Sequence, residues 1–228
     1  MPISALILKY AICYCAFFAM LLLSKANGGY KLFDEKGPAQ NTGALLGLQI
    51  AGIVWLGVVQ IFTFDHSWLE IVFGKSIPGF FPALIIALLL IAVILFARKQ
   101  SESLFGKIIS NQKPVKIFSQ AFILRYVLLR FLFLCAYEIS LRGYLLTDSV
   151  YYLGITKAVL LNAALYALLH APGNKKEMIA CIPFGILLCL ICIWLNTVWP
   201  AIVLHVSLSL TYETNLLKKF YKPINAFL

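Results

Sequence analysis

The sequence predicts an all-α protein, a polytopic membrane helix bundle of about seven transmembrane helices. Hydrophobic residues make up 62% and charged residues 12% of the 228-residue chain, against roughly 45–50% and about 25% in soluble domains. The apolar residues form long runs and do not alternate with polar ones, which excludes disorder and outer-membrane barrels. At about 20 residues per span, seven spans use roughly 140 residues. No separate soluble domain fits in the remainder.

Seven apolar runs can be followed along the chain. We expect the spans at about residues 3–23, 43–64, 79–97, 118–146, 156–170, 176–195 and 199–217. The fourth run continues to 146 because it contains no proline, and Pro172-Gly173 stops the fifth. We divide the chain into a three-span scaffold (1–117), a four-span core (118–217) and a basic cytoplasmic tail (218–228).

The basic residues follow the ends of the runs and do not gather on one solvated face. The formal net charge of +10 therefore indicates membrane orientation, and no nucleic acid partner is expected. With seven spans, thirteen Lys and Arg fall on one side and only Lys75 and Lys157 on the other. The positive-inside rule then places the N-terminus outside, and the C-terminus and a basic loop from Arg98 to Lys116 in the cytoplasm. We expect an integral protein of a bacterial inner (plasma) membrane, with the lipid bilayer as its surroundings.

Ionisable residues at membrane depth are costly, so they are the first candidates for function. The only carboxylate that the sequence places deep in a run is Glu138, four residues before Arg142 on the same helical face. This spacing predicts a structural ion pair. His170 lies as far beyond Gly154 as Glu138 lies before it. A helical hairpin turning at Gly154 would therefore bring Glu138 and His170 level.

A second histidine, His205, lies in the last run, with Ser209 one turn later. We expect His205 to reach the level of Glu138 only if the connection before it dips inward. Ser209 could then present its hydroxyl to the same cavity. The six cysteines lie within apolar runs without metal-binding spacing, which indicates buried apolar side chains.

Three short motifs occur in order between Leu124 and Leu210: Tyr137-Glu138-x-x-x-Arg142-Gly143, Tyr166-x-x-x-His170 and His205-x-x-x-Ser209. This series resembles the CAAX protease and bacteriocin-processing (CPBP/Abi) family of intramembrane endopeptidases, of the CAAX prenyl endopeptidase type. The resemblance implies a helix bundle with a conical cavity open to the cytoplasm. It also implies hydrolysis of a peptide or membrane-protein substrate, which is prenylated in eukaryotic members. Glutamate and the first histidine would activate water, while His205 and Ser209 would stabilise the oxyanion.

One position departs from the family pattern, because its first glutamate is Tyr137 here. Neighbouring helical residues point about 100° apart, so Glu138 cannot simply replace that carboxylate. A phenol with a reference pKa near 10 is also a poor base at pH 7. Two interpretations stay open: a peptidase that uses Glu138 or a water held by His170, and a non-catalytic relative that acts by binding, in bacteriocin immunity or as a membrane chaperone or scaffold.

A zinc site is a third, minor alternative. Two histidines and one carboxylate suit catalytic zinc, and Glu138, His170 and His205 would be its ligands. The sequence contains no H-E-x-x-H motif. We therefore expect catalysis without a cofactor.

Overall fold

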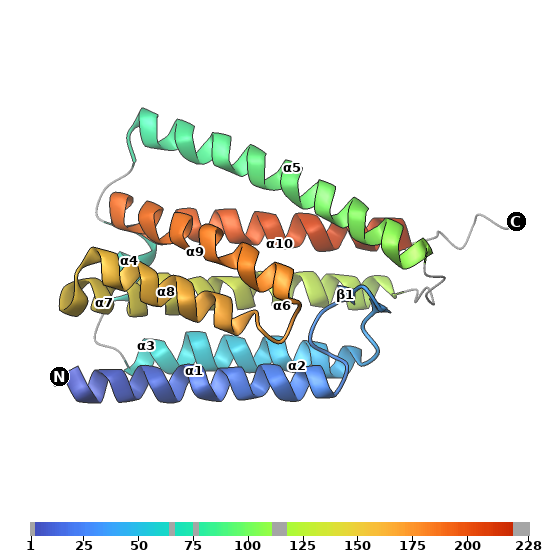
Figure 1. Cartoon of the computed structure of the whole chain (residues 1–228), viewed down its shortest axis with the longest axis horizontal. Helices are drawn as coiled ribbons and strands as arrows, with labels where there is room; N and C mark the ends of the chain where they lie inside the picture. The colour runs from blue at the N-terminus through green and yellow to red at the C-terminus, as the bar shows by residue number, and fades with distance from the viewer. Residues whose placement is uncertain (1–2, 64–66, 75–77, 111–117, 221–228) are drawn as a thin grey trace, which may run out of the picture.

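The computed structural model describes residues 3–63, 67–74, 78–110 and 118–220. The molecule is a bundle of roughly lengthwise helices, with one small hairpin at the end where α6 begins (Figure 1). The helices and strands are α1 Ile3–Ala26, β1 Phe33–Asp34, β2 Gly37–Pro38, α2 Thr42–Gly52, η1 Ile53–Val58, α3 Val59–Thr63, α4 Trp68–Phe73, α5 Phe80–Ser110, α6 Gln120–Glu138, η2 Ile139–Leu145, α7 Leu146–Leu153, α8 Ile155–Leu169, α9 Lys175–Leu195 and α10 Trp199–Phe220.

The predicted all-α membrane bundle is confirmed, and each predicted run corresponds to a helical segment. Within the described residues, four segments are long and apolar enough to cross a membrane: Ser4–Ala26, Thr42–Thr63, Phe80–Ser110 and Lys175–Leu195. The other three are α6–η2–α7, α8 and α10. The first and last carry charged and polar side chains, and α8 has only 15 residues. These three segments hold all the predicted site residues.

Local sequence signals account for the helix ends. Asn41, Ser119 and Asn174 cap the N-termini of α2, α6 and α9, each with a side-chain oxygen that accepts a backbone N–H. Gly154 ends α7 with φ +78°, a conformation that glycine adopts without strain. Asn196 ends α9 in the left-handed region. The turn predicted at Gly154 is therefore present.

Two π-helical segments, η1 and η2, interrupt otherwise continuous helices and contact each other. Polar side chains of α1 and α3 contact η2: the hydroxyls of Tyr14 and Ser140 are 2.8 Å apart, and Gln60 donates to Ser140 at 2.8 Å. On the opposite side of η2, Asn162 of α8 donates to the carbonyl of Leu141 at 2.6 Å. Because π-helical geometry disturbs the regular backbone hydrogen bonds, these side chains stabilise the segment that follows Glu138.

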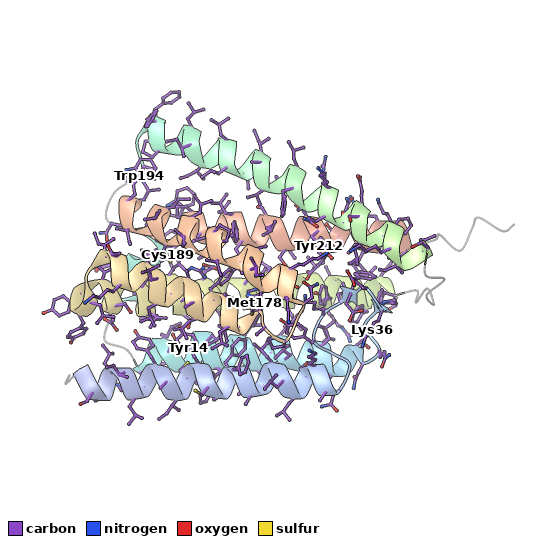
Figure 2. All side chains as sticks on the ribbon, in the orientation of Figure 1. Tyr14, Lys36, Met178, Cys189, Trp194 and Tyr212 are labelled. Atoms are coloured by element: carbon purple, nitrogen blue, oxygen red, sulfur yellow. The ribbon has the colours of Figure 1, made fainter. Side chains whose placement is uncertain are left out.

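Helices of the predicted scaffold pack on those of the predicted core: α2 packs on α6, and α5 packs along α10. Lys36 and Trp194 lie toward opposite ends of this bundle (Figure 2).

Two hydrogen bonds hold the turn between α9 and α10 on α4. Thr197 Oγ1 donates to the carbonyl of Val72 at 2.5 Å, and the Val198 N–H donates to the carbonyl of Ile71 at 3.1 Å. The helix α4 therefore fixes the start of α10.

One predicted boundary is wrong. The loop expected from Arg98 to Lys116 is helical as far as Ser110, because α5 continues beyond its apolar run. Lysine, arginine and glutamate are good helix formers, so the helix does not end where the apolar run does. Residues 111–117 and most of the predicted tail, 221–228, lie outside the described residues.

Candidate active site

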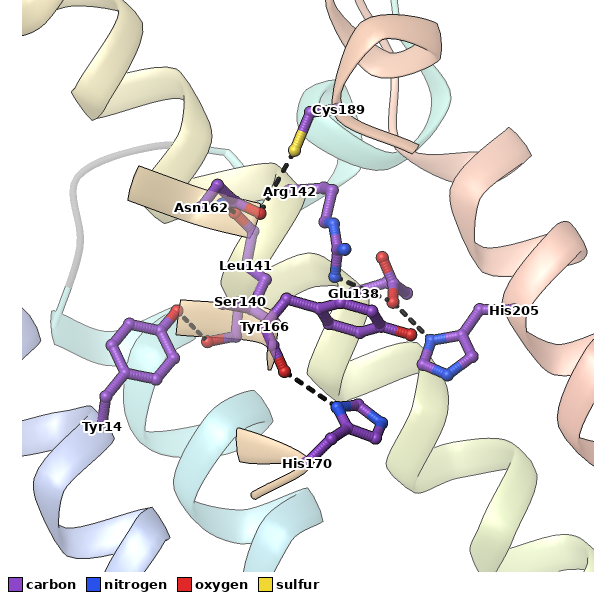
Figure 3. Close-up of polar contacts among 10 residues, drawn as sticks. All are labelled: Tyr14, Glu138, Ser140, Leu141, Arg142, Asn162, Tyr166, His170, Cys189 and His205. Carbon is purple, nitrogen blue, oxygen red and sulfur yellow. Dashed lines mark hydrogen bonds and ion pairs between the residues drawn. The ribbon is translucent and has the colours of Figure 1, made fainter. Parts of the chain in front are cut away.

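Glu138 occupies the centre of the candidate site, as the last residue of α6 before the π-helical segment. Its side chain is fully buried. Oε1 accepts a hydrogen bond from Arg142 Nη1 at 3.2 Å and lies 2.5 Å from His205 Nδ1 (Figure 3). Its other oxygen, Oε2, has no hydrogen-bond partner among the described residues. Glu138 is thus held between two basic side chains.

Arg142 is the partner that the four-residue spacing predicts, and its side chain is also fully buried. The guanidinium carbon lies 4.3 Å from the centre of the Tyr166 ring, a cation–π contact. A buried carboxylate without a counter-charge would cost several kcal/mol. Arg142 therefore neutralises the charge of Glu138, and the Tyr166 ring packs against the Arg142 guanidinium.

His205 comes from the second turn of α10 and is 6% exposed. It is level with Glu138, so the start of α10 lies deep enough for the two side chains to meet. Because an ionised carboxylate only accepts hydrogen bonds, His205 Nδ1 carries the proton of this contact. The Nε2 atom is then the ring nitrogen left for other contacts.

His170 is the residue that ends α8. Its Nδ1 lies 2.8 Å from the backbone carbonyl of Tyr166 (Figure 3). A carbonyl can only accept, so Nδ1 carries the proton and Nε2 of the neutral ring keeps its lone pair. His170 is therefore arranged as a proton acceptor at Nε2. The Tyr166 ring lies between the two histidines, with ring centres 4.7 Å from His170 and 5.8 Å from His205.

One cavity is lined by both histidines together with Tyr137, at the position of the family's first glutamate. The Tyr137 side chain is 4% exposed, and its ring lies edge-on to His205 at 5.9 Å. Its hydroxyl has no hydrogen-bond partner among the described residues. Glu138 is not among the lining residues and lies behind His205.

Two further predicted residues have other surroundings. Ser209 does not line this cavity; its hydroxyl accepts hydrogen bonds from Arg130 Nε at 3.1 Å and Nη2 at 2.9 Å. Ser209, one turn after His205 in α10, therefore contacts Arg130 in the structure. At Gly143 a Cβ atom would lie 2.6 Å from Ile71 of α4, so glycine there permits close packing.

A second buried carboxylate, Glu213, is 8% exposed on α10 and was not among the residues expected from the sequence. Its Oε1 lies 3.3 Å from Arg130 Nε. Glu213 follows His205 by eight residues, and Arg130 precedes Glu138 by eight. The pairs Glu138–His205 and Arg130–Glu213 therefore join the same faces of the antiparallel helices α6 and α10. The spacing of His205, Ser209 and Glu213 by four residues was the signal available in the sequence.

The described residues contain no group of three or more His, Cys, Asp and Glu side chains placed to hold a metal ion. The zinc site considered above stays an untested alternative. His170 Nδ1 is already used by a backbone carbonyl.

Comparison with known proteins agrees with the motifs. Residues 118–211 match the family model of the type II CAAX prenyl endopeptidase Rce1-like proteins. No curated protein and no solved structure gives a significant match to the chain. The matched segment contains Glu138, Arg142, His170 and His205, and runs from the start of α6 into α10. Over this segment, which is less than half of the 228-residue chain, the protein is similar to the type II CAAX prenyl endopeptidases.

Proposed function

We propose that this protein is an intramembrane endopeptidase that hydrolyses a peptide bond near the C-terminus of prenylated CAAX substrates. The observation that carries the proposal is the placement of His170, His205 and Tyr137 on one cavity, with Glu138 and Arg142 behind His205. The family model adds the substrate class, because it describes CAAX prenyl endopeptidases.

In the proposed reaction His170 is the general base. Its Nε2 lone pair accepts a proton from a water molecule in the cavity, and the hydroxide attacks the carbonyl carbon of the scissile bond. The proton on His170 is then transferred to the leaving amine when the C–N bond breaks. This assignment differs from a glutamate base, because Glu138 Oε1 is already engaged by two basic side chains.

The oxyanion of the tetrahedral intermediate needs hydrogen-bond donors in a site shielded from water. The Tyr137 hydroxyl has no partner among the described residues and lies on the same cavity. His205 in its protonated form donates from Nε2, with Glu138 as its counter-charge. Tyr137 then donates a hydrogen bond to the oxyanion, which a phenol can do at neutral pH. It does not act as a base, the role of the glutamate that stands at this position in the family.

A cleavage assay tests this assignment. His170→Gln keeps an amide that can donate to the Tyr166 carbonyl but cannot take a proton, so we expect the cleavage rate to fall at least about 10²-fold. Leu168→Ala, on the exposed face of the same helix end, is the matched control and should leave the rate unchanged. Cleavage by His170→Gln at the parent rate would contradict the role of His170.

A second candidate function is binding without cleavage, and the tyrosine at position 137 favours it. Such a protein would keep the cavity and its basic residues but would bind prenylated C-termini as a scaffold. Parent protein that binds a farnesylated peptide in vesicles and leaves it intact over long incubation would support this candidate. Cleavage that depends on His170 would exclude it.

A further inference from the structure

A buried amide joins three helical segments next to the candidate site. Asn162 of α8 is fully buried, and its Nδ2 atom donates to the carbonyl of Leu141 in η2 at 2.6 Å. Its Oδ1 atom accepts a hydrogen bond from Cys189 Sγ of α9 at 3.2 Å (Figure 3). Both polar ends of this side chain are therefore bonded, although the proposed reaction uses neither of them.

The carbonyl that Asn162 holds belongs to the peptide group between Leu141 and Arg142. In η2 the same carbonyl also accepts the backbone N–H of Leu146, five residues later, as in other π-helical turns. A carbonyl oxygen has two lone pairs, so it can accept both donors. The amide of Asn162 thus fixes the orientation of the peptide plane from which the Arg142 side chain starts.

The same face of α8 makes two further contributions to the site. Tyr166 follows Asn162 by one turn, and its ring packs on the Arg142 guanidinium at 4.3 Å. His170 follows by another turn and lines the cavity, with its ring held on the Tyr166 carbonyl. Residues four apart lie on one helix face. The helix α8 therefore holds Arg142 at its backbone and at its side chain, and it presents the proposed base from that same face.

The place of His170 in the site consequently depends on where α8 rests on η2. Asn162 lies eight residues before His170, which is about 12 Å along the helix at 1.5 Å per residue. The other buried residues around Asn162 on α8 are mostly small: Ala158, Val159, Ala163 and Ala167. Packing of small apolar side chains tolerates neighbouring registers, whereas a buried amide has to meet its partners. Asn162 is thus the residue of this interface that selects one register.

We propose that Asn162 is a positioning residue, whose bridge from η2 to α9 sets the register of α8 and thereby places His170 Nε2 for proton transfer. This inference rests on the proposed function, in which His170 is the base. A displacement of about 1 Å in a reacting group can lower a rate by about 10²-fold. Asn162 is not among the residues that line the cavity. Loss of the bridge should therefore slow the chemical step and leave substrate binding unchanged.

The test separates the chemical step from binding and from stability. Asn162→Leu keeps the branched side-chain skeleton and removes both hydrogen bonds, while the Leu141 carbonyl keeps its π-helical donor; Asn162→Ala, which adds no bulk, is measured in parallel. With full-length protein in phosphatidylcholine vesicles, we expect kcat for a farnesylated peptide to fall at least about tenfold. Binding of the intact peptide is measured in His170→Gln protein with and without Asn162→Leu, and Kd should change less than about twofold. Tm in detergent should fall by no more than about 4 °C, because a hydrogen bond between membrane helices contributes little.

Two further variants examine the bridge itself. Cys189→Ala removes the donor to Asn162 Oδ1 and should lower kcat, whereas Cys189→Ser supplies a hydroxyl donor and should keep kcat near the parent value. In the Asn162→Leu background, Cys189→Ala should lower kcat no further, because the amide that it holds is already absent. Leu160→Ala, at an exposed position of α8, is the control and should leave kcat, Kd and Tm unchanged.

The positioning role and the proposed function fail separately. Parent kcat in Asn162→Leu, or a fall caused by Cys189→Ala that is as large in the Asn162→Leu background as alone, would overturn the positioning role and leave proteolysis intact. A large loss of Tm in both Asn162→Leu and Asn162→Ala, or a weakened Kd, would also overturn it, because Asn162 would then serve folding or substrate binding. Parent protein without His170-dependent cleavage would refute the proposed function, and the positioning role with it.

Discussion

Replacing Arg142 by leucine should destabilise the protein strongly, because it removes one partner of a buried ion pair. The side chains of Arg142 and Glu138 are both fully buried, and their closest atoms are 3.2 Å apart. Breaking such a pair typically costs about 3–5 kcal/mol, since the remaining charge is uncompensated. His205 at 2.5 Å can offset part of this cost if its ring is protonated.

The assay is thermal unfolding of purified protein in detergent micelles. For a chain of this length about 1 kcal/mol corresponds to roughly 2–4 °C in Tm, so Arg142→Leu should lower Tm by about 6–20 °C. Combining Arg142→Leu with Glu138→Leu removes both charges and should recover most of the loss. Arg125→Leu, at an exposed arginine of α6, should change Tm little. An Arg142→Leu protein as stable as the parent would refute the pairing argument.

Four other substitutions test the packing, the orientation and the oxyanion contact. Gly52→Ala should lower the free energy of unfolding by about 1–3 kcal/mol, because the new Cβ would overlap the Phe133 ring. Gly47→Ala, where the new Cβ would meet open space, should raise it by up to about 1 kcal/mol. Thermal unfolding in detergent compares the two variants. A cysteine at Ser110, in a cysteine-free background, should react with an impermeant thiol reagent from the cytoplasmic side, and labelling from the outside would contradict the orientation. Tyr137→Phe should lower the cleavage rate about 10²-fold with little change in stability, and an unchanged rate would exclude the hydroxyl as a donor.

Much of the fold could be predicted because bilayer-sized apolar runs are a strong signal. The run boundaries agree with the helix ends within a few residues at the turn glycine Gly154 and at Pro172-Gly173. The exception is α5, whose continuation past Arg98 carries no apolar signal. The π-helical segments could not be predicted either, because they depend on partners from other helices, among them Gln60 and Asn162.

The site could be predicted in part. Glu138, Arg142, His170 and His205 are rare ionisable residues in apolar surroundings, which is why the sequence singles them out. Glu213 was missed because it lies close to the lysines that end the last run, where a carboxylate is usually solvated. Burial of Glu213 depends on its contact with Arg130 across two helices. Such a contact between distant residues cannot be read from local hydropathy.

The two pairs together explain how α6 and α10 find one register. In the structure Glu138 faces His205 and Arg130 faces Glu213, eight residues along each helix in opposite directions. A shift of one turn would place Glu213 opposite Leu134 and leave Arg130 opposite Leu217. This shifted arrangement would leave the buried charges of Arg130 and Glu213 without partners, at a cost of several kcal/mol. The Arg130–Glu213 pair thus helps to keep His205 in contact with Glu138. The charged residues that make these two segments less apolar than ordinary membrane spans are therefore the residues that align the candidate site.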